Sequence, residues 1–181
     1  TVRSAYITFT DEFGGEYIQS TNILFDIDRE EVTFMFDNDV LTKGLEAYLH
    51  LDFQGTLNDQ MAGFYRSKVT DNKYCAVTQF ESTDARRAFP CGDEPMLKAT
   101  FDVKISVPKG RGLTVLSNMP VNNITEEHIM STYKFQKTPI MSTYLLAFFV
   151  GEMDYIETTA HMPDTGNNVL VRVYTPKGEQ E

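Results

Sequence analysis

Two long runs of the sequence alternate apolar and polar residues with a period of two. In the first run, every second residue from Leu45 to Phe53 is apolar. The second run, residues 98–107, repeats the pattern from Ala99 to Val107. Successive side chains of a strand point to opposite faces, whereas a helix would spread these apolar positions around its whole circumference. Each run is therefore predicted to be a strand with one buried face and one wet face.

Shorter stretches of strand-like sequence follow one another along the chain, separated by turns rich in Gly, Asn, Asp and Pro. They are residues 4–10, 31–36, 74–80, 113–116, 132–136 and 169–174. The apolar run 144–150 is too short to span a membrane and fits a buried strand. Only 84–89 and 126–130 favour short helical turns. Many short strands at fairly even spacing predict an all-β fold, a large antiparallel β-sandwich or saddle.

The composition is that of an ordinary globular domain. The chain has 181 residues, of which 41% are hydrophobic, so one domain can bury a sizeable core. We expect this domain to cover residues 1–174. The polar residues 175–181 are predicted to begin the connection to a further domain.

Charge and cysteine usage exclude several classes of partner. The 26 acidic and 16 basic residues are scattered, and no Lys/Arg patch provides a footprint for nucleic acid. No apolar run reaches membrane-spanning length, so no membrane partner is expected. The start of the sequence lacks the features of a signal peptide. Cys75 and Cys91 fit free thiols in a reducing compartment, so the expected location is the cytoplasm.

Residues with recognisable catalytic spacing are missing from this sequence. The three histidines, His50, His128 and His161, lie far apart, so the H-E-x-x-H pattern of zinc peptidases does not occur. A Gly-x-Ser-x-Gly turn and a phosphate-binding Gly-rich loop are absent as well. We therefore predict no catalytic residue, no bound cofactor and no metal ligand in this chain.

Four ordered blocks of sequence carry a family resemblance. The central block contains Thr-Gln-Phe-Glu at 78–81, Asp-Ala-Arg-Arg-Ala-Phe-Pro-Cys at 84–91, Asp-Glu-Pro at 93–95 and Lys-Ala-Thr-Phe-Asp at 98–102. The others are Met-Ala-Gly-Phe-Tyr-Arg-Ser at 61–67, Thr-Pro-Ile-Met-Ser-Thr-Tyr-Leu-Leu-Ala-Phe at 138–148 and Val-Arg-Val-Tyr-Thr at 171–175. Over nearly its whole length the chain resembles the N-terminal domain of the zinc aminopeptidases of the puromycin-sensitive and aminopeptidase N family.

The resemblance implies a β saddle that packs against a catalytic domain holding zinc. The parent enzyme would remove single residues from the N-terminus of peptides. This sequence ends before the family's G-A-M-E-N loop and zinc motif, and it begins after the family's opening strands. The resemblance therefore implies that the chain alone is inactive. Its partners would be the catalytic domain and, in the full-length enzyme, the N-terminus of a peptide.

Two residues match substrate-binding positions of the family. Glu81 matches the acidic residue that binds the free α-amino group, and Gln79 matches a residue lining the pocket for the first side chain. A carboxylate at a fixed distance from the metal would recognise a cationic terminus and set which bond is cut. Residue type alone favours a structural interpretation of Glu81, as a solvated strand-end carboxylate or as an ion-pair partner of Arg86 or Arg87. The motif around Glu81 favours substrate binding instead.

Other residues of the central block are interpreted as architectural. Asp84 resembles a helix N-cap, and Asp93 and Glu94 are expected to be turn residues and salt-bridge partners. Gly92 stands where the family usually carries an aromatic residue. An alternative of another class is a stand-alone β-sandwich module for protein interactions. A reading frame that lacks G-A-M-E-N and H-E-x-x-H downstream of Glu181 would favour that alternative.

Overall fold

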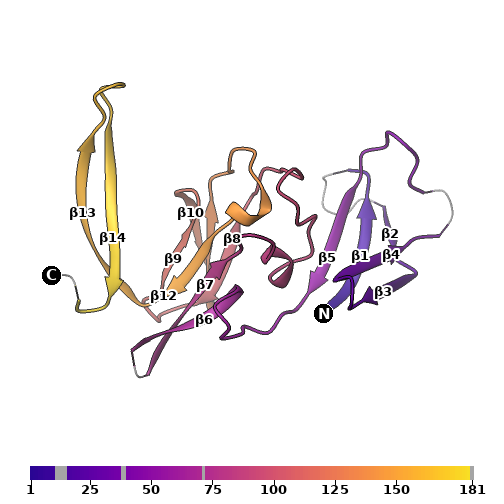
Figure 1. The fold of residues 1–181 in the computed structure, drawn as a ribbon, viewed down its shortest axis with the longest axis horizontal. Coiled ribbons are helices and arrows are strands. Elements are labelled where there is room, and N and C mark those ends of the chain that lie inside the picture. The colour runs from indigo at the N-terminus through magenta and orange to yellow at the C-terminus, as the bar shows by residue number, and fades with distance from the viewer. Residues whose placement is uncertain (11–15, 38–39, 71, 180–181) are drawn as a thin grey trace. The chain divides into compact units, whose positions relative to one another are not determined.

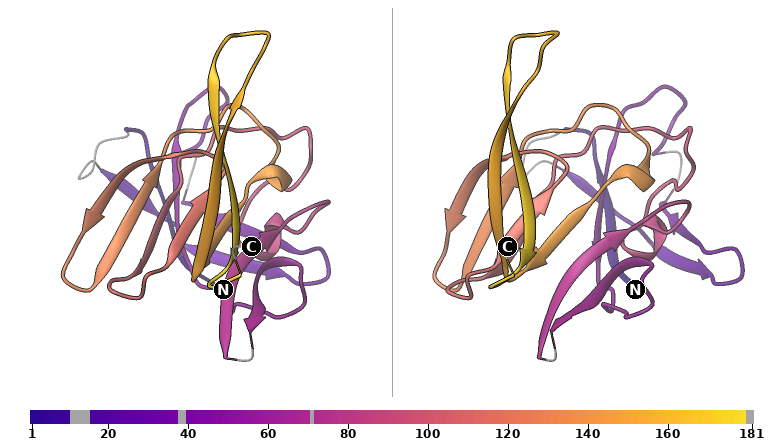
Figure 2. Two further views of the ribbon diagram at one scale, coloured as in Figure 1. Left: turned by 90° about the vertical axis from the view of Figure 1, so that its left-hand side faces the viewer. Right: turned by 60° about the vertical axis from the view of Figure 1, so that its left-hand side comes forward.

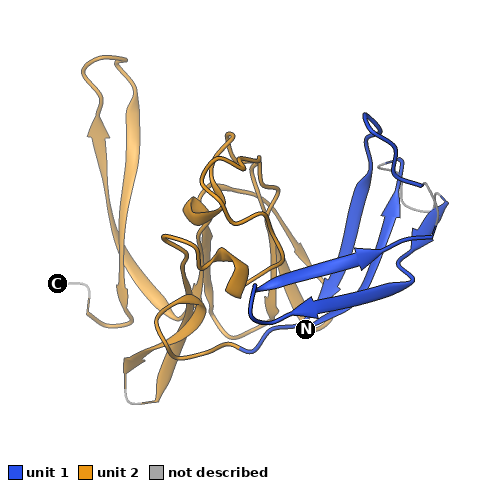
Figure 3. Cartoon of the chain, turned by 45° about the vertical axis from the view of Figure 1, so that its right-hand side comes forward, with its two compact units in different colours: residues 1–56 blue, residues 57–181 orange. Residues whose placement is uncertain are grey.

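The computed structural model describes residues 1–10, 16–37, 40–70 and 72–179. These residues form fourteen strands and two short 3-10 helices, and all pairings between the strands are antiparallel. The all-β prediction is therefore confirmed. None of the helices in this part of the chain is long and apolar enough to cross a membrane. The chain divides into two compact units, residues 1–56 and 57–181 (Figure 3).

The first unit contains one three-stranded sheet and one hairpin. Its strands are β1 (Val2–Thr8), β2 (Tyr17–Gln19), β3 (Asn22–Asp26), β4 (Glu31–Met35) and β5 (Tyr48–Phe53). The sheet has the order β2-β1-β5, and β3 pairs with β4. Ala5 and Ile7 are its buried apolar residues. Leu49 and Phe53, predicted on a buried face, are 49% and 41% exposed, so that face of β5 is only partly covered.

The second unit contains the remaining strands. They are β6 (Gly63–Thr70), β7 (Lys73–Gln79), β8 (Lys104–Pro108), β9 (Thr114–Ser117), β10 (Val121–Glu126), β11 (Met130–Phe135), β12 (Phe148–Gly151), β13 (Met153–His161) and β14 (Asn168–Pro176). They form a four-stranded sheet, β6-β7-β12-β9, and a three-stranded sheet, β10-β11-β8. β13 and β14 form a long two-stranded ribbon (Figures 1 and 2). The 3-10 helices are η1 (Ala85–Arg87) and η2 (Thr143–Leu145).

Three predicted elements differ from the structure. In the alternating run 98–107 only β8 is a ladder strand, because Phe101 donates its N–H to the Thr138 hydroxyl at 2.9 Å rather than to a neighbouring strand. The apolar run 144–150 begins within η2 and becomes a strand only at Phe148. Residues 126–130 are not helical, because the Glu127 N–H bonds to the Met130 carbonyl at 2.9 Å and closes the β10–β11 hairpin.

The second unit has two apolar clusters. The first surrounds Phe80, Ala85 and Leu146, and it joins the end of β7 to both 3-10 helices. The second surrounds Val107, Val115 and Phe135, and it fills the space between β8, β9 and β11. Burial of apolar surface of this kind is the main favourable contribution to folding. The first cluster matters for function because the predicted substrate-binding residues lie directly beside it.

Truncation of Phe135 should test the second cluster. The Phe135 side chain is 2% exposed, whereas Phe25 on β3 is 53% exposed. We expect Phe135→Ala to lower the free energy of unfolding by about 3–5 kcal/mol, because it removes a buried ring and leaves a cavity. The matched variant Phe25→Ala should cost less than about 1 kcal/mol. Urea unfolding followed by circular dichroism measures both values, and equal losses would contradict this assignment of the core.

Candidate functional site

Gln79 and Glu81 lie at the end of β7, the second strand of the four-stranded sheet. β7 is held on both sides, by β6 through the pair Gly63–Gln79 and by β12 through the pair Val77–Phe149. Glu81 follows two residues later in an exposed turn, and Gln79 is exposed as well. The strand therefore delivers both predicted site residues to solvent at one edge of the unit, as neighbours in one short segment.

Phe80, which lies between them, points into the core. It is 2% exposed, and its ring packs edge-on against Phe89 and Phe148, with both pairs of ring centroids 5.9 Å apart. The end of the strand is also tied to β12, because Thr78 Oγ1 accepts the Phe148 N–H at 3.1 Å. Aromatic side chains bury large surfaces and adopt few rotamers. Phe80 thus fixes the backbone between Gln79 and Glu81.

The turn after Glu81 leads directly into η1. The Asp84 N–H bonds to the Phe80 carbonyl at 2.9 Å, and the Phe89 N–H bonds to the Ala85 carbonyl at 3.1 Å. The prediction that the Asp84 side chain caps the helix is wrong, because it makes no capping hydrogen bond. The Asp84 carboxylate instead pairs with Arg87 Nε at 2.6 Å, since a guanidinium three residues on is within its reach.

Asp93 is the buried acid of the site. Its side chain is 3% exposed, and Oδ2 accepts hydrogen bonds from Arg86 Nε at 3.0 Å and from the Arg86 backbone N–H at 3.1 Å. Its other oxygen accepts the Thr143 hydroxyl at 3.1 Å. The expectation that Asp93 is a salt-bridge partner is confirmed, with Arg86 as that partner. No ion pair of Glu94 occurs among the described residues, so that part of the expectation is wrong. Glu94 is exposed, so the two adjacent acids differ in role.

These ion pairs bear on one of the structural interpretations of Glu81, that of a partner for Arg86 or Arg87. Arg86 binds Asp93, and Arg87 binds Asp84. Within residues 1–10, 16–37, 40–70 and 72–179, no hydrogen bond or ion pair involves the Glu81 carboxylate. Glu81 is therefore not the structural partner of either arginine. Its carboxylate is exposed and able to accept hydrogen bonds from a ligand.

Three of the sequence blocks that carry the resemblance meet around this strand end. Gly63, from the first block, has a φ of +72°, and a Cβ there would lie 2.7 Å from Arg87 Cβ, so η1 packs directly against β6. From the third block, Ser142 donates to the Pro95 carbonyl at 2.6 Å, next to the contact between Thr143 and Asp93. The pattern along the chain contained no signal for these contacts between distant blocks.

The described part of the chain offers no metal site. No group of three or more His, Cys, Asp or Glu side chains in it is placed to hold an ion. His50 stacks on Tyr6 with ring centroids 4.4 Å apart, and its Nε2 is 2.9 Å from the Thr8 hydroxyl. His161 Nδ1 lies 3.1 Å from Asn168 Oδ1. Among the described residues, these histidines are therefore not grouped as ligands of one ion.

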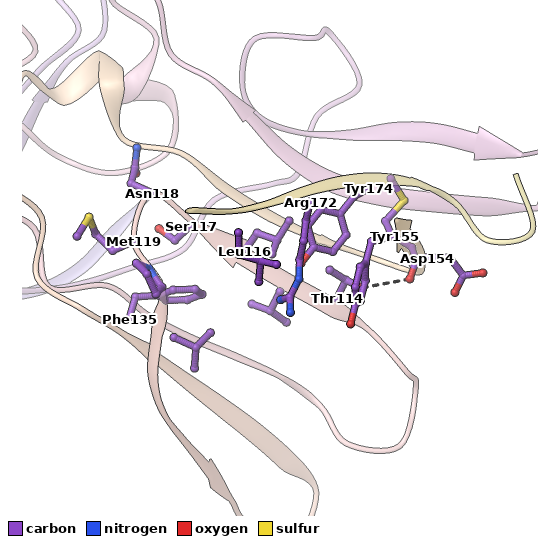
Figure 4. A pocket seen from close by; sticks show the side chains of 15 residues that line it. Thr114, Leu116, Ser117, Asn118, Met119, Phe135, Asp154, Tyr155, Arg172 and Tyr174 are labelled. Atoms are coloured by element: carbon purple, nitrogen blue, oxygen red, sulfur yellow. Dashed lines mark hydrogen bonds between the residues drawn. The ribbon is translucent and has the colours of Figure 1, made fainter. Parts of the chain in front are cut away.

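An open groove of about 1080 Å³ lies beside β9 and the β13–β14 ribbon, and sequence reasoning did not predict it (Figure 4). Two of the residues that line it are joined by a hydrogen bond, in which Thr114 Oγ1 donates to the Met153 carbonyl at 3.3 Å. Inside it, the Arg172 guanidinium lies 4.7 Å from the centre of the Tyr155 ring. Neither Gln79 nor Glu81 lines this groove, so it is separate from the candidate site.

Both cysteines are free, and their surroundings suppress ionisation. Burial raises the pKa of the Cys75 thiol. Burial also raises the pKa of Cys91 to about 11, with the charge of Asp93 adding to the effect. Because a thiolate is the reactive form, both thiols are protonated and unreactive near neutral pH.

Comparison with known proteins gives a consistent family match. The model of the Peptidase M1 N-terminal domain matches residues 2–145. Aminopeptidase M1-B of Oryza sativa is 49% identical over 137 residues, covering 74% of this chain and 15% of that protein. The alanine/arginine aminopeptidase of Saccharomyces cerevisiae is 46% identical over 161 residues, covering 84% of this chain and 18% of that protein. Aminopeptidase M1 of Arabidopsis thaliana is 38% identical over 100% of this chain and 20% of its own length.

The chain thus spans between 15% and 20% of the length of these relatives. Whatever the remaining four-fifths contribute to the activity of those proteins is outside the residues described above. The matched region includes Gln79, Glu81 and the Asp93 contacts.

The raised thiol pKa values give a direct test of the geometry around Cys91. In the folded protein, alkylation of both cysteines should be slow at pH 7 and should accelerate as the pH rises toward about 11 for Cys91. The unfolded, unreduced protein should show two thiols that react at ordinary rates. Mass spectrometry after timed labelling gives the rates. Rapid labelling of Cys91 in the folded protein at pH 7 would show that its burial beside Asp93 is wrong.

Proposed function

This chain belongs to the peptidase M1 family as its N-terminal domain, and from that membership we propose that it is the substrate-recognition and docking domain of a zinc-dependent aminopeptidase. The full-length enzyme would remove single residues from the N-terminus of peptides. Glu81 would bind the α-amino group of the substrate, and Gln79 would line the pocket for its first side chain.

The observation that carries this proposal is the exposed carboxylate of Glu81 on a strand end held by two neighbouring strands, with no ion pair to it among the residues that the structure describes. An aminopeptidase must bind a cationic terminus and reject internal peptide bonds. A carboxylate fixed in space does both, through a charge-assisted hydrogen bond to the ammonium group. Phe80 and the pairing of β7 with two neighbours hold Glu81 in place, while both arginines nearby are bound to other acids.

Gln79 takes the second role because of its position and its chemistry. It is exposed two residues before Glu81, at the last pair of the β6–β7 ladder. Its amide is uncharged and donates as well as accepts hydrogen bonds, so it suits a side-chain pocket better than an ammonium. Its contribution should be smaller than that of Glu81.

Exposed apolar residues beside the site support a docking role. Met96 and Leu97 are 78% and 52% exposed, and Ile140 is 68% exposed. They belong to loops that lie side by side, since Ala99 and Met141 form a bridge between them. Apolar surface of this kind marks interaction sites. We propose that the catalytic domain of the full-length protein covers it, which would bring the zinc site near Glu81.

Zinc itself would be bound by residues outside this chain. It would supply the activated water that attacks the peptide bond. The residues of this chain would bind and orient the substrate. We further propose the cytoplasm as the working compartment, because the two thiols are free and buried or half-buried.

The isolated chain should therefore bind no zinc stoichiometrically and should not hydrolyse an aminoacyl-arylamide. The reason is that its described residues provide no ligand group for the metal. Metal analysis after dialysis and a colorimetric rate assay measure the two properties. One tightly held zinc per chain, together with turnover, would overturn the proposal that catalysis belongs to another part of the protein.

Replacement of Glu81 in the full-length enzyme tests the proposed function itself. Glu81→Gln should lower kcat/KM for an aminoacyl-arylamide by about thirty-fold to several thousand-fold, which corresponds to a loss of about 2–5 kcal/mol. Zinc content and melting temperature should not change, because the side chain contacts neither metal nor core. A rise in KM alone would indicate that Glu81 binds the ground state and the transition state equally. A fall in kcat would indicate that Glu81 also orients the scissile bond.

Two variants serve as references for this experiment. Gln79→Ala should cost less than Glu81→Gln, because it removes a neutral contact. Glu127→Gln, an exposed acid in the β10–β11 turn, should leave kcat/KM unchanged. Wild-type kcat/KM in Glu81→Gln would end the assignment.

A further inference from the structure

The segment that carries Glu81 is short and exposed, and it is closed by the hydrogen bond from the Asp84 N–H to the Phe80 carbonyl. Residues 81–83 are exposed, and the 3-10 helix that follows them is only three residues long. Its N-terminus has no side-chain cap. A helix this short does not sustain itself, because helix nucleation costs more than one or two hydrogen bonds return. Contacts outside the turn therefore fix its C-terminal end, as Phe80 fixes its N-terminal end. One of them is Ala85, which is 0% exposed in the cluster with Phe80 and Leu146.

The buried carboxylate of Asp93 provides a second anchor. It accepts two hydrogen bonds from one residue, from the Arg86 backbone N–H at 3.1 Å and from Arg86 Nε at 3.0 Å. Together these bonds fix the helix backbone as well as the guanidinium. The Asp93 backbone carbonyl accepts a third bond from Arg86 Nη2 at 3.3 Å. A charge-assisted pair of this kind is stronger than ordinary neutral hydrogen bonds.

Thr143 connects this anchor to the sheet. Its hydroxyl donates to Asp93 Oδ1 at 3.1 Å, and the residue is 5% exposed. Thr143 begins η2, which is followed by β12, and β12 is the neighbour of β7. The chain of contacts therefore runs from β12 through Thr143 and Asp93 to Arg86. Both ends of the turn that carries Glu81 are thus connected to the same four-stranded sheet, one end through β7 and the other through Arg86, Asp93 and Thr143.

On its other side, η1 lies against β6. A Cβ on Gly63 would lie 2.7 Å from Arg87 Cβ and 3.5 Å from the Asp84 carbonyl oxygen, so no side chain fits between the helix and the strand. The helix can shift toward neither β6 nor solvent without breaking a contact. Without the Asp93 anchor, η1 would keep its contacts with β6 and the Phe80 cluster but lose its bonds through Arg86, so the turn that holds Glu81 would be less firmly fixed.

We infer that Asp93 is a positioning residue for substrate recognition, acting through Arg86 and the turn to hold Glu81 where it meets the α-amino group. This inference rests on the proposed function of Glu81. Asp93 is buried and does not touch substrate itself. A displacement of about 1 Å in a group that orients a substrate is enough to cost on the order of a hundred-fold in rate.

A double-mutant cycle in the full-length enzyme tests this inference. The variants are Asp93→Asn, Glu81→Gln and the double variant, with kcat/KM measured on an aminoacyl-arylamide. Asp93→Asn should lower kcat/KM by about ten- to a hundred-fold in the enzyme that retains Glu81. In the Glu81→Gln background the same substitution should cost less than about three-fold, because the residue that it positions is already lost. Asp102→Asn, an exposed acid paired with Lys137, is the matched control and should change neither value.

Zinc content and melting temperature are measured for every variant, so that losses of fold are separated from losses of positioning. If Asp93→Asn does not fold, the pair Thr143→Val and Thr143→Ser replaces it, since only the serine keeps the hydroxyl that binds Asp93. Thr143→Val should then lose activity several-fold where Glu81 is present. Thr143→Ser should keep the activity of the parent enzyme. In the Glu81→Gln background, neither substitution should change kcat/KM further.

Two results would overturn the inference. One is wild-type kcat/KM in folded, zinc-loaded Asp93→Asn enzyme, or in Thr143→Val enzyme where that pair is used. The other is an equal loss in both backgrounds, which would mean that Asp93 acts independently of Glu81. Failure of the proposed function looks different, because Glu81→Gln would then have wild-type kcat/KM whatever Asp93 does.

Discussion

A buried charge at Asp93 sets the arrangement of the site. With 3% of its side chain exposed, Asp93 needs donors from the protein, and they come from Arg86 on η1 and Thr143 on η2. A buried ion that loses one partner costs several kcal/mol, so these segments must stay together. The bond between Ser142 and the Pro95 carbonyl strengthens the same contact. The pairing of β7 with β6 and β12 and the burial of Phe80 complete the strand end.

Residues 79–81 at the end of β7 alternate between a structural role and a proposed chemical role. Phe80 is buried and secures the backbone, whereas Gln79 and Glu81 on either side of it are exposed. Other acids bind the two arginines of η1, because Asp84 pairs with Arg87 and Asp93 pairs with Arg86. Neither of these two arginines therefore pairs with the carboxylate proposed to recognise a substrate. A rigid scaffold that presents one free polar group is a common way to build a specific site.

The strands of this chain could be predicted from local sequence because a period of two is itself a local property. The structure of residues 126–130 could not be predicted in this way, because the hydrogen bond that closes the β10–β11 hairpin determines it. The missing cap at Asp84 could not be predicted either, because the Asp84 carboxylate pairs with Arg87 instead. Glu81 was identified through a family resemblance, because its residue type alone also fits a solvated carboxylate or an ion-pair partner. The link between Asp93 and Thr143 joins residues fifty positions apart, and no periodicity or spacing reports a contact at that distance.

In the proposed function, β7 and the Asp93 anchor present Glu81 to the α-amino group of a peptide. A crystal structure of the full-length enzyme with a bound, uncleaved peptide analogue tests this arrangement. We expect a Glu81 carboxylate oxygen about 2.7–2.9 Å from the α-amino nitrogen, as in other charge-assisted hydrogen bonds. We also expect Arg86 to remain bound to Asp93. An ammonium group held by other acids, with Glu81 facing solvent, would contradict the proposed role of Glu81.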